Sequence, residues 1–397
     1  MTAPLRVGIV GCGNVALNFH VPAYQAEPDR FTITALADPT PERLELGRST
    51  TGLSPDQVHS DALALIARDD VDVVDVCTPQ HLHRDLAVAA AAAGKHILCE
   101  KPLAAAPADA AAMVKAAEQA QVVLGVVHNY LFFPEIVAAR TLIDDGAIGE
   151  VRTVTVDMLG VVDSPGAAGY RPQWRHDPAA AGGGVLMDML HGVYLGEHLL
   201  GEPVERVSAY VDAATPGDAV EGLALCRLES SCRAALVNIG WGFGPGGIRI
   251  NGSKGRIVLR YRDEGTIPWA PFESLSLTTE AGTEILDLPP GQELVPLVAT
   301  ALQATVADFA DAVTTGRAPV APGRAALHTL EATVAAYTSA ALGESVGIPL
   351  PVDGPVHRRG VIGLAELDVP AASSVRASGL FGLAADSSST DLPTDGS

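Results

Sequence analysis

Side chains that can handle protons gather at two places in the sequence. Lys101 lies in the run Glu100-Lys101-Pro102 directly after an apolar segment, and Asp188 and His191 follow a run of three glycines. A lysine stabilises negative charge that develops on oxygen, and histidine is the side chain best suited to accept a proton near neutral pH. These residue types favour chemistry on a hydroxyl or carbonyl group, with Lys101, Asp188 and His191 as the catalytic candidates.

Asp188 and His191 are three positions apart in a segment that predicts one continuous helix. Side chains three or four positions apart share a helix face, so we expect Asp188 to orient His191 or to grip a substrate hydroxyl. The alternative is that His191 only packs the helix, in which case Lys101 carries the proton and Tyr194 and His198 are secondary candidates. Such a pair could also bind a metal, but no clear third ligand accompanies it, and we expect no metal.

A second motif indicates a dinucleotide. The run Gly11-Cys12-Gly13-Asn14-Val15-Ala16 follows an apolar segment and fits G-x-G-x-x-G/A, in which Gly11 permits a tight turn and Gly13 lets the backbone approach a pyrophosphate. Asp38 ends the next apolar segment, where a carboxylate accepts a hydrogen bond from a ribose hydroxyl and repels a 2′-phosphate. The pattern predicts NAD rather than NADP, and the alternative is a purely structural glycine turn.

The elements that must position these residues change in character near residue 125. Up to that point short β-branched runs alternate with alanine-rich helical runs, which predicts a parallel sheet covered by helices on both faces. The expected strands are Leu5–Val10, Phe31–Ala37, Val71–Cys77, His96–Cys99 and Val122–Val126. The fold class is therefore α/β, beginning with a doubly wound Rossmann sheet.

A second, α+β domain with a large, mostly antiparallel sheet is expected beyond residue 150. Its expected strands are Val151–Met158, Arg206–Val211, Leu223–Leu228, Ala234–Ile239, Gly247–Asn251, Arg256–Tyr261 and Leu275–Thr279. The expected helices are Gly184–Leu200, Leu297–Thr315 and Arg324–Leu342, and the last two can pack back onto the first domain. We assign residues 1–125 to the NAD-binding domain, 126–355 to a substrate and oligomerisation domain, and 356–397 to a tail whose last part lacks the pattern of a folded segment.

Taken together, the motifs resemble those of the Gfo/Idh/MocA oxidoreductases, which include glucose–fructose oxidoreductase and inositol dehydrogenase. The matching segments are 11–16, 20–23, 37–39, 77–83, 94–103, 146–151 and 182–188. The resemblance implies that Lys101 is the catalytic lysine, that the open sheet of the second domain forms subunit contacts, and that the protein is a homodimer or homotetramer. It also implies hydride chemistry on a sugar, cyclitol or related polyol.

The sequence departs from the family pattern at two places. The family commonly has Asp-x-x-x-His where this chain has Asp188-Met-Leu-His191, so the imidazole would emerge about 100° around a helix from the usual place. The family often has Asn, one further residue and then Arg-Phe, whereas Asn129 is followed by Tyr130-Leu131-Phe132. An expected basic group is therefore missing.

Residues at the carboxyl ends of parallel strands are expected around the cofactor, because ligands bind at that edge of such sheets. The expected cofactor contacts are Gly11, Gly13, Asn14, Val15, Asp38, Thr78, Pro79, His81, His83, Glu100, Lys101 and Asn129. A loop with Tyr170, Arg171 and the next aromatic and basic residues suits a sugar pocket with stacking rings and bidentate donors, or else only covers the site. The expected substrate contacts are Lys101, His128, Tyr130, Trp174, Arg175, His176, Asp188 and His191.

These expectations favour an NAD-dependent oxidoreductase that oxidises a secondary hydroxyl of a sugar, cyclitol or sugar glycoside, or reduces the corresponding ketone. Some relatives retain bound NAD and use transient oxidation for glycoside cleavage or epimerisation, and this remains the alternative. A dinucleotide-sensing regulator without catalysis is less favoured, because Lys101, Asp188 and His191 are all present.

Composition restricts the partners. The formal net charge of −21 argues against nucleic acid, since phosphate binding needs a basic face. No segment approaches the ~20 apolar residues of a membrane span, and no secretion signal is evident, so we expect no membrane partner. Five cysteines without a C-x-x-C pair favour a reduced, cytoplasmic protein with small-molecule partners.

Overall fold

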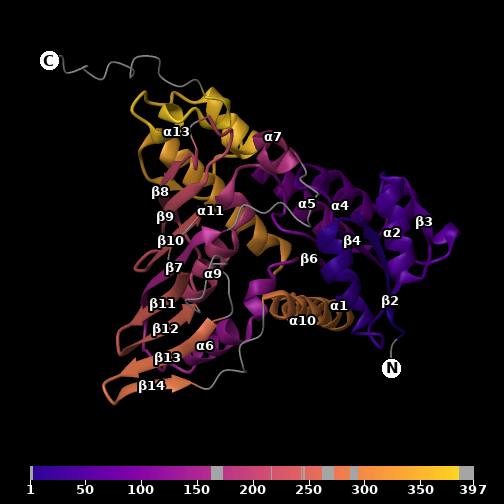
Figure 1. Ribbon diagram of the computed structural model, residues 1–397, viewed down its shortest axis with the longest axis horizontal. Coiled ribbons are helices and arrows are strands. Elements are labelled where there is room, and N and C mark those ends of the chain that lie inside the picture. Colours follow the sequence, from indigo (N-terminus) through magenta and orange to yellow (C-terminus); the bar gives the residue numbers. More distant parts are fainter. Residues whose placement is uncertain are drawn as a thin grey trace.

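Two sheets, with helices around and between them, make up the described part of the chain in the computed structural model (Figure 1). The structure describes residues 3–161, 173–215, 217–242, 244, 246–261, 272–286 and 294–383. The first sheet is parallel and the second is mostly antiparallel, which confirms the expected α/β class with a Rossmann sheet and an open second sheet. None of the described helices combines the length and the apolar character needed to cross a membrane.

The first sheet has six parallel strands in the order β3-β2-β1-β4-β5-β6. Their bounds are β1 (Leu5–Val10), β2 (Phe31–Ala37), β3 (Val58–His59), β4 (Val73–Val76), β5 (His96–Cys99) and β6 (Leu124–Val126). The main crossover helices are α1 (Val21–Gln25), α2 (Pro41–Thr51), α3 (Ala62–Ile66), α4 (His83–Ala92) and α5 (Pro107–Ala120). The strand order reverses between β1 and β4, and doubly wound sheets bind ligands at this point.

The second sheet has nine strands in the order β14-β13-β12-β11-β7-β10-β9-β8-β15. All neighbours are antiparallel except β7 and β10. Its strands are β7 (Val151–Val161), β8 (Arg206–Asp212), β9 (Leu223–Glu229), β10 (Ala234–Trp241), β11 (Gly246–Gly252), β12 (Gly255–Tyr261), β13 (Phe272–Thr279), β14 (Gly282–Leu286) and β15 (Val346–Gly347). Sequence analysis missed β3, β14 and β15, because these short strands lie at sheet edges and carry little apolar alternation.

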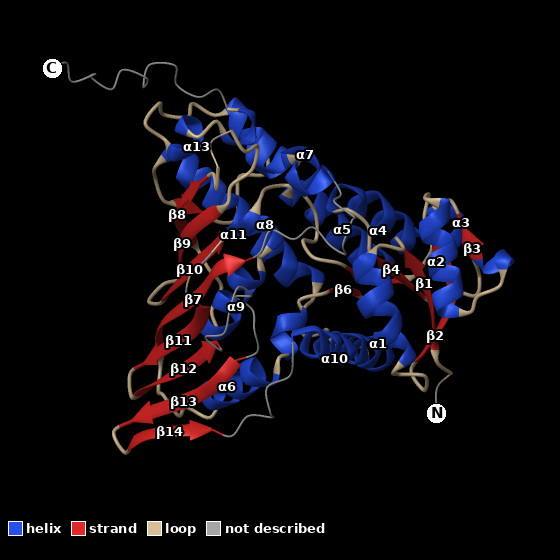
Figure 2. Cartoon of the chain, viewed as in Figure 1, coloured by secondary structure: helices blue, strands red, loops and turns tan. Residues whose placement is uncertain are grey.

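The described helices that pack on the second sheet cover one of its faces (Figure 2). These are α6 (Pro134–Asp144), α9 (His191–Leu200) and α11 (Gly323–Leu342). In β9, Ala224, Cys226 and Leu228 are buried while Leu225 and Arg227 are exposed. This period of two means that one face packs under the helices and the other is open.

The long helix α10 (Leu294–Thr315) returns to the first domain, as expected from its sequence (Figure 1). Val306 and Phe309 are buried in one cluster with Val7 and Ile9 of β1. Gly125 makes this approach possible, because a Cβ atom there would lie 2.7 Å from the Phe309 ring. The domain that begins the chain is therefore completed by a helix from near its end.

The helix expected over 184–200 is wrong as one element. The chain forms a short helix, α8 (Val185–Asp188), and then α9, which begins at His191. Met189 lies between them with φ −105° and ψ 32°, outside the helical range. The break changes the direction of His191 relative to Asp188, so the argument from a shared helix face no longer holds.

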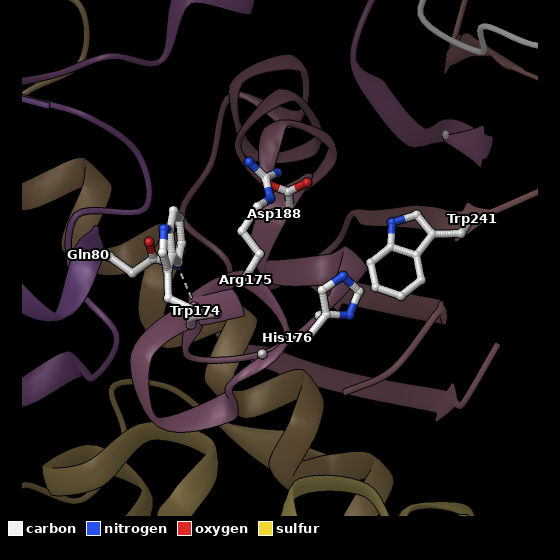
Figure 3. Close-up of a pocket in the computed structure, with 9 residues that line it drawn as sticks. Gln80, Trp174, Arg175, His176, Asp188 and Trp241 are labelled. Carbon is white, nitrogen blue, oxygen red and sulfur yellow. Dashed lines mark hydrogen bonds and ion pairs between the residues drawn. The ribbon is translucent and has the colours of Figure 1, made fainter. Parts of the chain in front are cut away.

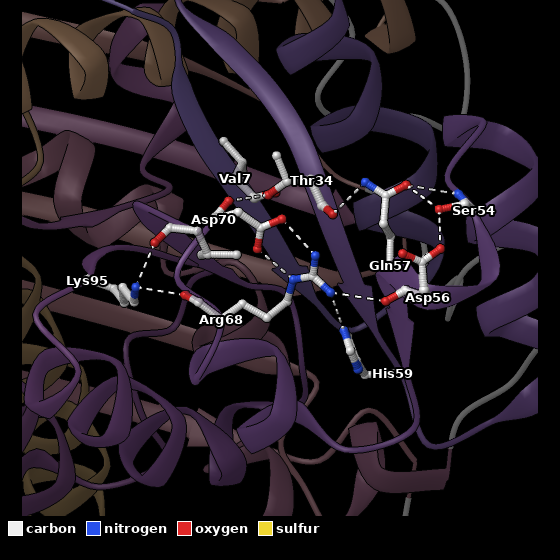
Figure 4. Close-up of polar contacts among 10 residues, drawn as sticks. Val7, Thr34, Ser54, Asp56, Gln57, His59, Arg68, Asp70 and Lys95 are labelled. Carbon is white, nitrogen blue, oxygen red and sulfur yellow. Dashed lines mark hydrogen bonds and ion pairs between the residues drawn. The ribbon is translucent and has the colours of Figure 1, made fainter.

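A polar network closes the amino-terminal edge of the first sheet (Figure 4). Arg68 donates to both carboxylate oxygens of Asp70, at 2.7 Å each, and to the carbonyl of Asp56 at 3.0 Å. Lys95 donates to the carbonyls of Arg68 and Val71. These contacts join the segments before β3, β4 and β5, so this edge is occupied by structural bonds and the carboxyl edge is left for ligands.

The segment from residue 355 contacts both domains. It forms α12 (Pro355–Arg359) and α13 (Ser374–Ala377), with α12 against α5 and α13 against β8 and α11. The side chains of Val375, Leu380 and Phe381 are buried. The expectation of a weakly structured last part falls mainly on residues 384–397, which lie outside the described residues.

Candidate active site

The glycine motif forms a tight turn between β1 and the helical turn that follows. Gly11 has φ +97°, and a Cβ atom there would lie 2.6 Å from the carbonyl oxygen of Cys77. Asp38 accepts hydrogen bonds from the backbone amides of Cys12 and Thr40, both at 2.8 Å. The carboxylate expected to meet a ribose is therefore held at the mouth of the turn.

The surroundings of this turn fit a dinucleotide. A Cβ atom built on Gly13 has nothing within 4 Å, so the backbone there faces open space. Thr78 Oγ1 is buried without a hydrogen-bond partner among the described residues, and Val15 is 45% exposed beside the turn. An orphaned hydroxyl, an exposed apolar side chain and an open glycine are features that a bound pyrophosphate and its sugar rings would complete.

Arg43 is anchored at the same turn. Its Nε donates to the carbonyl of Cys12 at 2.8 Å, and Nη2 lies 3.5 Å from Asn14 Oδ1. Asn14 is thus brought to the turn together with Gly11, Gly13, Val15 and Asp38, as the sequence predicts.

Two histidines that sequence analysis placed near the cofactor have different surroundings. His83 is buried, with Nε2 2.8 Å from the carbonyl of Thr78 and Nδ1 3.1 Å from that of Pro102. Its ring links two loops, so we correct the expectation that it faces the nicotinamide. His81 is exposed on the loop after Pro79.

Lys101 lies at the carboxyl end of β5 and joins the two domains. Its Nζ donates to the backbone carbonyl of Asp188 at 2.6 Å and lies 3.7 Å from Asp188 Oδ1. Arg175 donates to the same carboxylate oxygen at 2.6 Å. The Lys101–Pro102 peptide bond is cis. The lysine and the carboxylate that sequence analysis selected are therefore in contact, and Arg175 is a second cation beside them.

Asp188 and Arg175 line a small pocket, whereas Lys101 is not among its lining residues (Figure 3). Arg175 extends to Asp188, while the ring of His176 lies 5.6 Å from that of Trp241. The Arg175 guanidinium lies 5.8 Å from the Trp174 ring. Four of the expected substrate residues thus line one pocket: Trp174, Arg175, His176 and Asp188. Tyr170 and Arg171 lie outside the described residues.

Sequence analysis missed two residues that line this pocket, Gln80 and Trp241. Gln80 Nε2 donates to the carbonyl of Ala181 at 2.7 Å, which ties the loop after β4 to the segment before α8. Trp241 ends β10 between two glycines, and an aromatic residue at such a strand end was a signal for a pocket wall.

His191 does not pair with Asp188; it belongs to a stack of buried rings. Its Nδ1 lies 2.6 Å from the hydroxyl oxygen of Tyr194, which also accepts the backbone amide of Tyr130 at 3.2 Å. The His191 ring stacks on Tyr130 with centroids 3.9 Å apart, and His128 stacks on Tyr194 at 4.1 Å. The hydrogen-bond partner of the His191 ring is therefore Tyr194 and not Asp188.

The charges of the site favour an anionic Asp188 beside neutral imidazoles. Although desolvation acts against ionisation, the charges on Lys101 and Arg175 hold the pKa of Asp188 below its ordinary value. Burial and the charge on Lys101 lower the pKa of His191 well below its ordinary range, and the same causes lower the pKa of His128 to about 3. His128 Nε2 is buried without a partner among the described residues, and Asn129 is buried next to it.

Two protein-family models match the chain. One, described as an oxidoreductase family with an NAD-binding Rossmann fold, covers residues 5–128. The other, the GFO/IDH/MocA C-terminal domain, covers residues 136–258. The first sheet thus belongs to an NAD-binding domain, in agreement with the glycine turn and Asp38.

Named relatives are reductases and dehydrogenases. The chain is 32% identical over 255 residues to levoglucosan dehydrogenase of Pseudarthrobacter phenanthrenivorans, covering 61% of each chain. It is 32% identical over 329 residues to dTDP-3,4-didehydro-2,6-dideoxy-alpha-D-glucose 3-reductase of Streptomyces violaceoruber, covering 78% of this chain and 85% of the relative. Among solved structures, aldose-aldose oxidoreductase from Caulobacter crescentus, complexed with glycerol, matches 87% of this chain and 100% of its own at 27% identity and a TM-score of 0.75.

Proposed function

The chain belongs to the Gfo/Idh/MocA oxidoreductase family, and we propose that it uses NAD to oxidise a secondary hydroxyl of a sugar, cyclitol or sugar glycoside, or to reduce the corresponding ketone. The observation that carries this proposal is the contact between Lys101, from the NAD-binding domain, and Asp188, from the second domain. The named relatives that act on sugars support the substrate class.

The cofactor would lie along the carboxyl edge of the first sheet, held by the turn at Gly11 and Gly13 and by the carboxylate of Asp38. The loop at Thr78 and Pro79 would cover it, with Glu100 and Asn129 at the nicotinamide end. When bound, NAD accepts a hydride from the carbinol carbon of the substrate. The residues of this chain must then orient the hydroxyl, remove its proton and exclude water.

Lys101 is proposed to stabilise the oxygen of the substrate as its proton leaves. Its ammonium group donates to the backbone carbonyl of Asp188 and lies 3.7 Å from the carboxylate. A fixed positive charge in a partly buried pocket stabilises an alkoxide more than bulk water does. Arg175 neutralises Asp188 from the other side. The lysine is therefore not fully neutralised by that carboxylate and remains available to the substrate.

His191 is proposed to accept the hydroxyl proton at Nε2. Nδ1 is occupied by Tyr194, whose oxygen has two lone pairs and can accept both this N–H and the amide of Tyr130. In that tautomer Nε2 carries a free lone pair, as a general base requires. The lowered pKa of His191 keeps the ring neutral before the proton arrives.

The pocket walls favour a polyol. Trp174 and Trp241 offer apolar ring faces, and Arg175 and His176 offer hydrogen-bond donors. Such pairs of a ring and a donor suit the alternating apolar and hydroxyl faces of a pyranose or cyclitol. Tyr130 and His128 would approach the same substrate from the ring stack.

Two finer features belong to the same proposal. Tyr210, Leu225 and Leu236 are 45%, 39% and 44% exposed on three neighbouring strands of the open sheet, and we assign this face to contacts between copies in a homodimer or homotetramer. The thiols of all five cysteines are free, in keeping with a reduced, cytoplasmic environment.

The first experiment is to follow the reduced-nicotinamide absorbance band with purified protein, NAD and a panel of monosaccharides, inositols and glycosides. We expect the band to grow with one substrate class and, in the reverse direction, to decay with the matching ketone. A flat trace for the whole panel, with NAD nonetheless released from denatured protein, would instead support transient oxidation in a glycoside-cleaving or epimerising enzyme.

A further inference from the structure

His20 lies in the interior beneath the active site, between two carboxylates. Its Nδ1 is 2.7 Å from Asp75 Oδ2, and its Nε2 is 2.9 Å from Glu100 Oε1. The side chains of His20 and Asp75 are fully buried, and that of Glu100 is 14% exposed. The other oxygen of Glu100 accepts the backbone amide of Lys101 at 2.9 Å. A continuous chain of contacts thus runs from Asp75 through His20 and Glu100 to Lys101.

The backbone brings His20 to this place by an uncommon route. The cofactor turn opens into a π-helical turn, Ala16–His20, and His20 is its last residue. Isolated π-helical turns are rare and are frequent at functional sites. Asp75 comes from β4 and Glu100 from the end of β5, so three separate segments of the NAD-binding domain meet at one imidazole.

The geometry favours a doubly protonated ring. A neutral imidazole has one N–H, so its other nitrogen would direct a lone pair at a carboxylate less than 3 Å away. Two buried carboxylates without a cation would also be strongly disfavoured. Although burial opposes it, the charge of Asp75 raises the pKa of His20 well above its ordinary value. Burial likewise opposes ionisation of Glu100, and the hydrogen bond from His20 lowers the pKa of that carboxyl.

We propose that His20 is a positioning residue of the reaction: as an imidazolium between Asp75 and Glu100, it holds the Glu100 carboxylate on the amide of Lys101 and ties the lysine to the cofactor-binding turn. The lysine backbone has no comparable support from its own strand, because β5 ends at Cys99. This inference rests on the proposed function, in which Lys101 acts on the substrate oxygen.

A metal ion is the competing occupant. One donor atom each from His20, Asp75 and Cys77 lie within 4.8 Å of one another. A metal at Nδ1 would need that nitrogen deprotonated, whereas the separation of 2.7 Å from Asp75 is that of a charge-assisted hydrogen bond. Ion pairing with the two carboxylates therefore accounts for the short contacts of both His20 nitrogens, whereas a metal would account for the position of only one.

The first test is the protonation state of His20 in the intact protein. Nitrogen-15 spectra of histidine side chains distinguish imidazolium from neutral rings, and the variant His20→Gln assigns the signal. We expect His20 to remain an imidazolium above neutral pH, where an ordinary histidine is neutral. A neutral ring at neutral pH, or a signal that shifts on addition of zinc, would overturn the proposal. The measurement needs no substrate, so it stands whether or not the proposed reaction is found.

The second test separates positioning from packing. We expect His20→Gln to lower kcat about 10- to 100-fold while the dissociation constant of NAD changes less than about threefold, because Asp38 still holds the cofactor turn. Adding Glu100→Gln should cause no further loss, since both changes break the same chain of contacts. The matched control is His96→Gln on β5, whose ring accepts the amide of Val123 and should leave kcat unchanged. Losses that multiply in the double variant would mean that His20 only fills space.

The variant Asp75→Asn provides a pH-dependent readout. Several titratable groups face His20 or its two partners. They are Tyr24 of α1, Asp75 and Cys77 of the β4 segment, His83 of α4, Cys99, Glu100 and Lys101 of the β5 segment, and Tyr194 of α9. Removing the charge of Asp75 lowers the pKa of His20, so the ring loses its proton as pH rises. We expect kcat of this variant to fall as pH rises, at pH values where the unmodified enzyme keeps its kcat. If kcat of Asp75→Asn and kcat of the unmodified enzyme changed with pH in the same way, the proposed role of the His20 imidazolium would be contradicted.

Discussion

At the scale of single residues, the site places two cations on one carboxylate. Lys101 and Arg175 both contact Asp188, and only Lys101 comes from the domain that holds the cofactor. Arg175 already satisfies Asp188, so the substrate can displace the lysine from that carboxylate at little cost. This arrangement supports the proposal that Lys101 leaves its contact with Asp188 to stabilise the reacting oxygen.

The variant Lys101→Ala tests this assignment. We expect kcat to fall about 1,000-fold or more, because the transition state loses the cation that stabilises its oxygen. The dissociation constant of NAD should change by no more than about threefold, since the glycine turn and Asp38 are untouched. Lys115→Ala, an exposed lysine of α5, is the matched control and should turn over normally. The measurements are steady-state kinetics and NAD binding. Normal turnover in Lys101→Ala would show that Lys101 does not stabilise the reacting oxygen.

The variant Tyr194→Phe tests the tautomer of His191. Without the hydroxyl, Nδ1 of His191 and the amide of Tyr130 lose their partner, and the ring no longer holds its lone pair at Nε2. We expect kcat to fall about 10- to 100-fold with a smaller change in KM, as for loss of a general base. Tyr210→Phe, on the open sheet face, is the control. A change confined to KM would show that Tyr194 shapes the pocket without acting through His191.

Much of this site could be predicted from residue types and spacing, but the partnerships within it could not. Lys101, Asp188 and Asp38 were selected because short motifs depend on local backbone geometry that neighbours in sequence encode. The contact between Arg175 and Asp188 and the stack of His191 on Tyr130 were not predicted. They depend on the break at Met189 and on segments far apart in the chain, and helical periodicity carries no information about either.

At the scale of elements, the short helix α8 carries Asp188 and depends on one buried acid. Glu221 accepts the amides of Gly184 and Leu186 and the hydroxyl of Tyr337, at 2.8 to 2.9 Å. The Glu221 carboxyl group thus accepts hydrogen bonds from backbone amides at the start of α8, which have no partner within the helix. The helix is too short to be stable by itself, so this carboxyl group and Tyr337 hold Asp188 in place.

Glu221 predicts a pH dependence of stability. Burial raises its pKa to about 7 against the opposing backbone hydrogen bonds, from an ordinary value of 4.5. A raised folded pKa favours the folded state at low pH, so this contribution is complete below about pH 4.5 and is lost as pH rises through about 7. The shift corresponds to about 3 kcal/mol at most. We expect the free energy of unfolding, measured with denaturant, to be lower at about pH 8 than at about pH 5 in the unmodified protein. In Glu221→Gln this difference should be smaller.

The stability of Glu221→Gln is compared with that of the unmodified protein and of a control variant. The amide side chain keeps the volume but directs a donor at the amide of Gly184, so the variant should be less stable at low pH while titrating less. The control is Glu205→Gln, directly before β8 of the second sheet. It shows how the pH dependence of the unfolding free energy responds to loss of a different carboxylate. An equal pH dependence in Glu221→Gln and the unmodified protein would mean that other groups cause it.

At the scale of the whole molecule, the active site exists only where two domains meet. Lys101 comes from the first sheet, whereas Asp188, His191 and Tyr194 come from α8 and α9 against the second. Helix α10 packs on the first domain and α11 contacts both sheets, so the two halves are joined by the chain end as well as by the site (Figure 1). The fold class follows from apolar periodicity, while the strand order and the edge strands depend on contacts distant in sequence.

The open face of the second sheet gives the last prediction. Leu236 lies in the middle of β10 and is 44% exposed, between β7 and β9, so a lysine there costs an isolated chain little and places a charge in an apolar contact between copies. We expect Leu236→Lys to shift the protein from dimer or tetramer to a smaller species in light scattering after size exclusion, with unchanged NAD binding. Leu46→Lys on α2, 47% exposed, should keep the native assembly. If Leu236→Lys keeps it too, the copies associate through another surface.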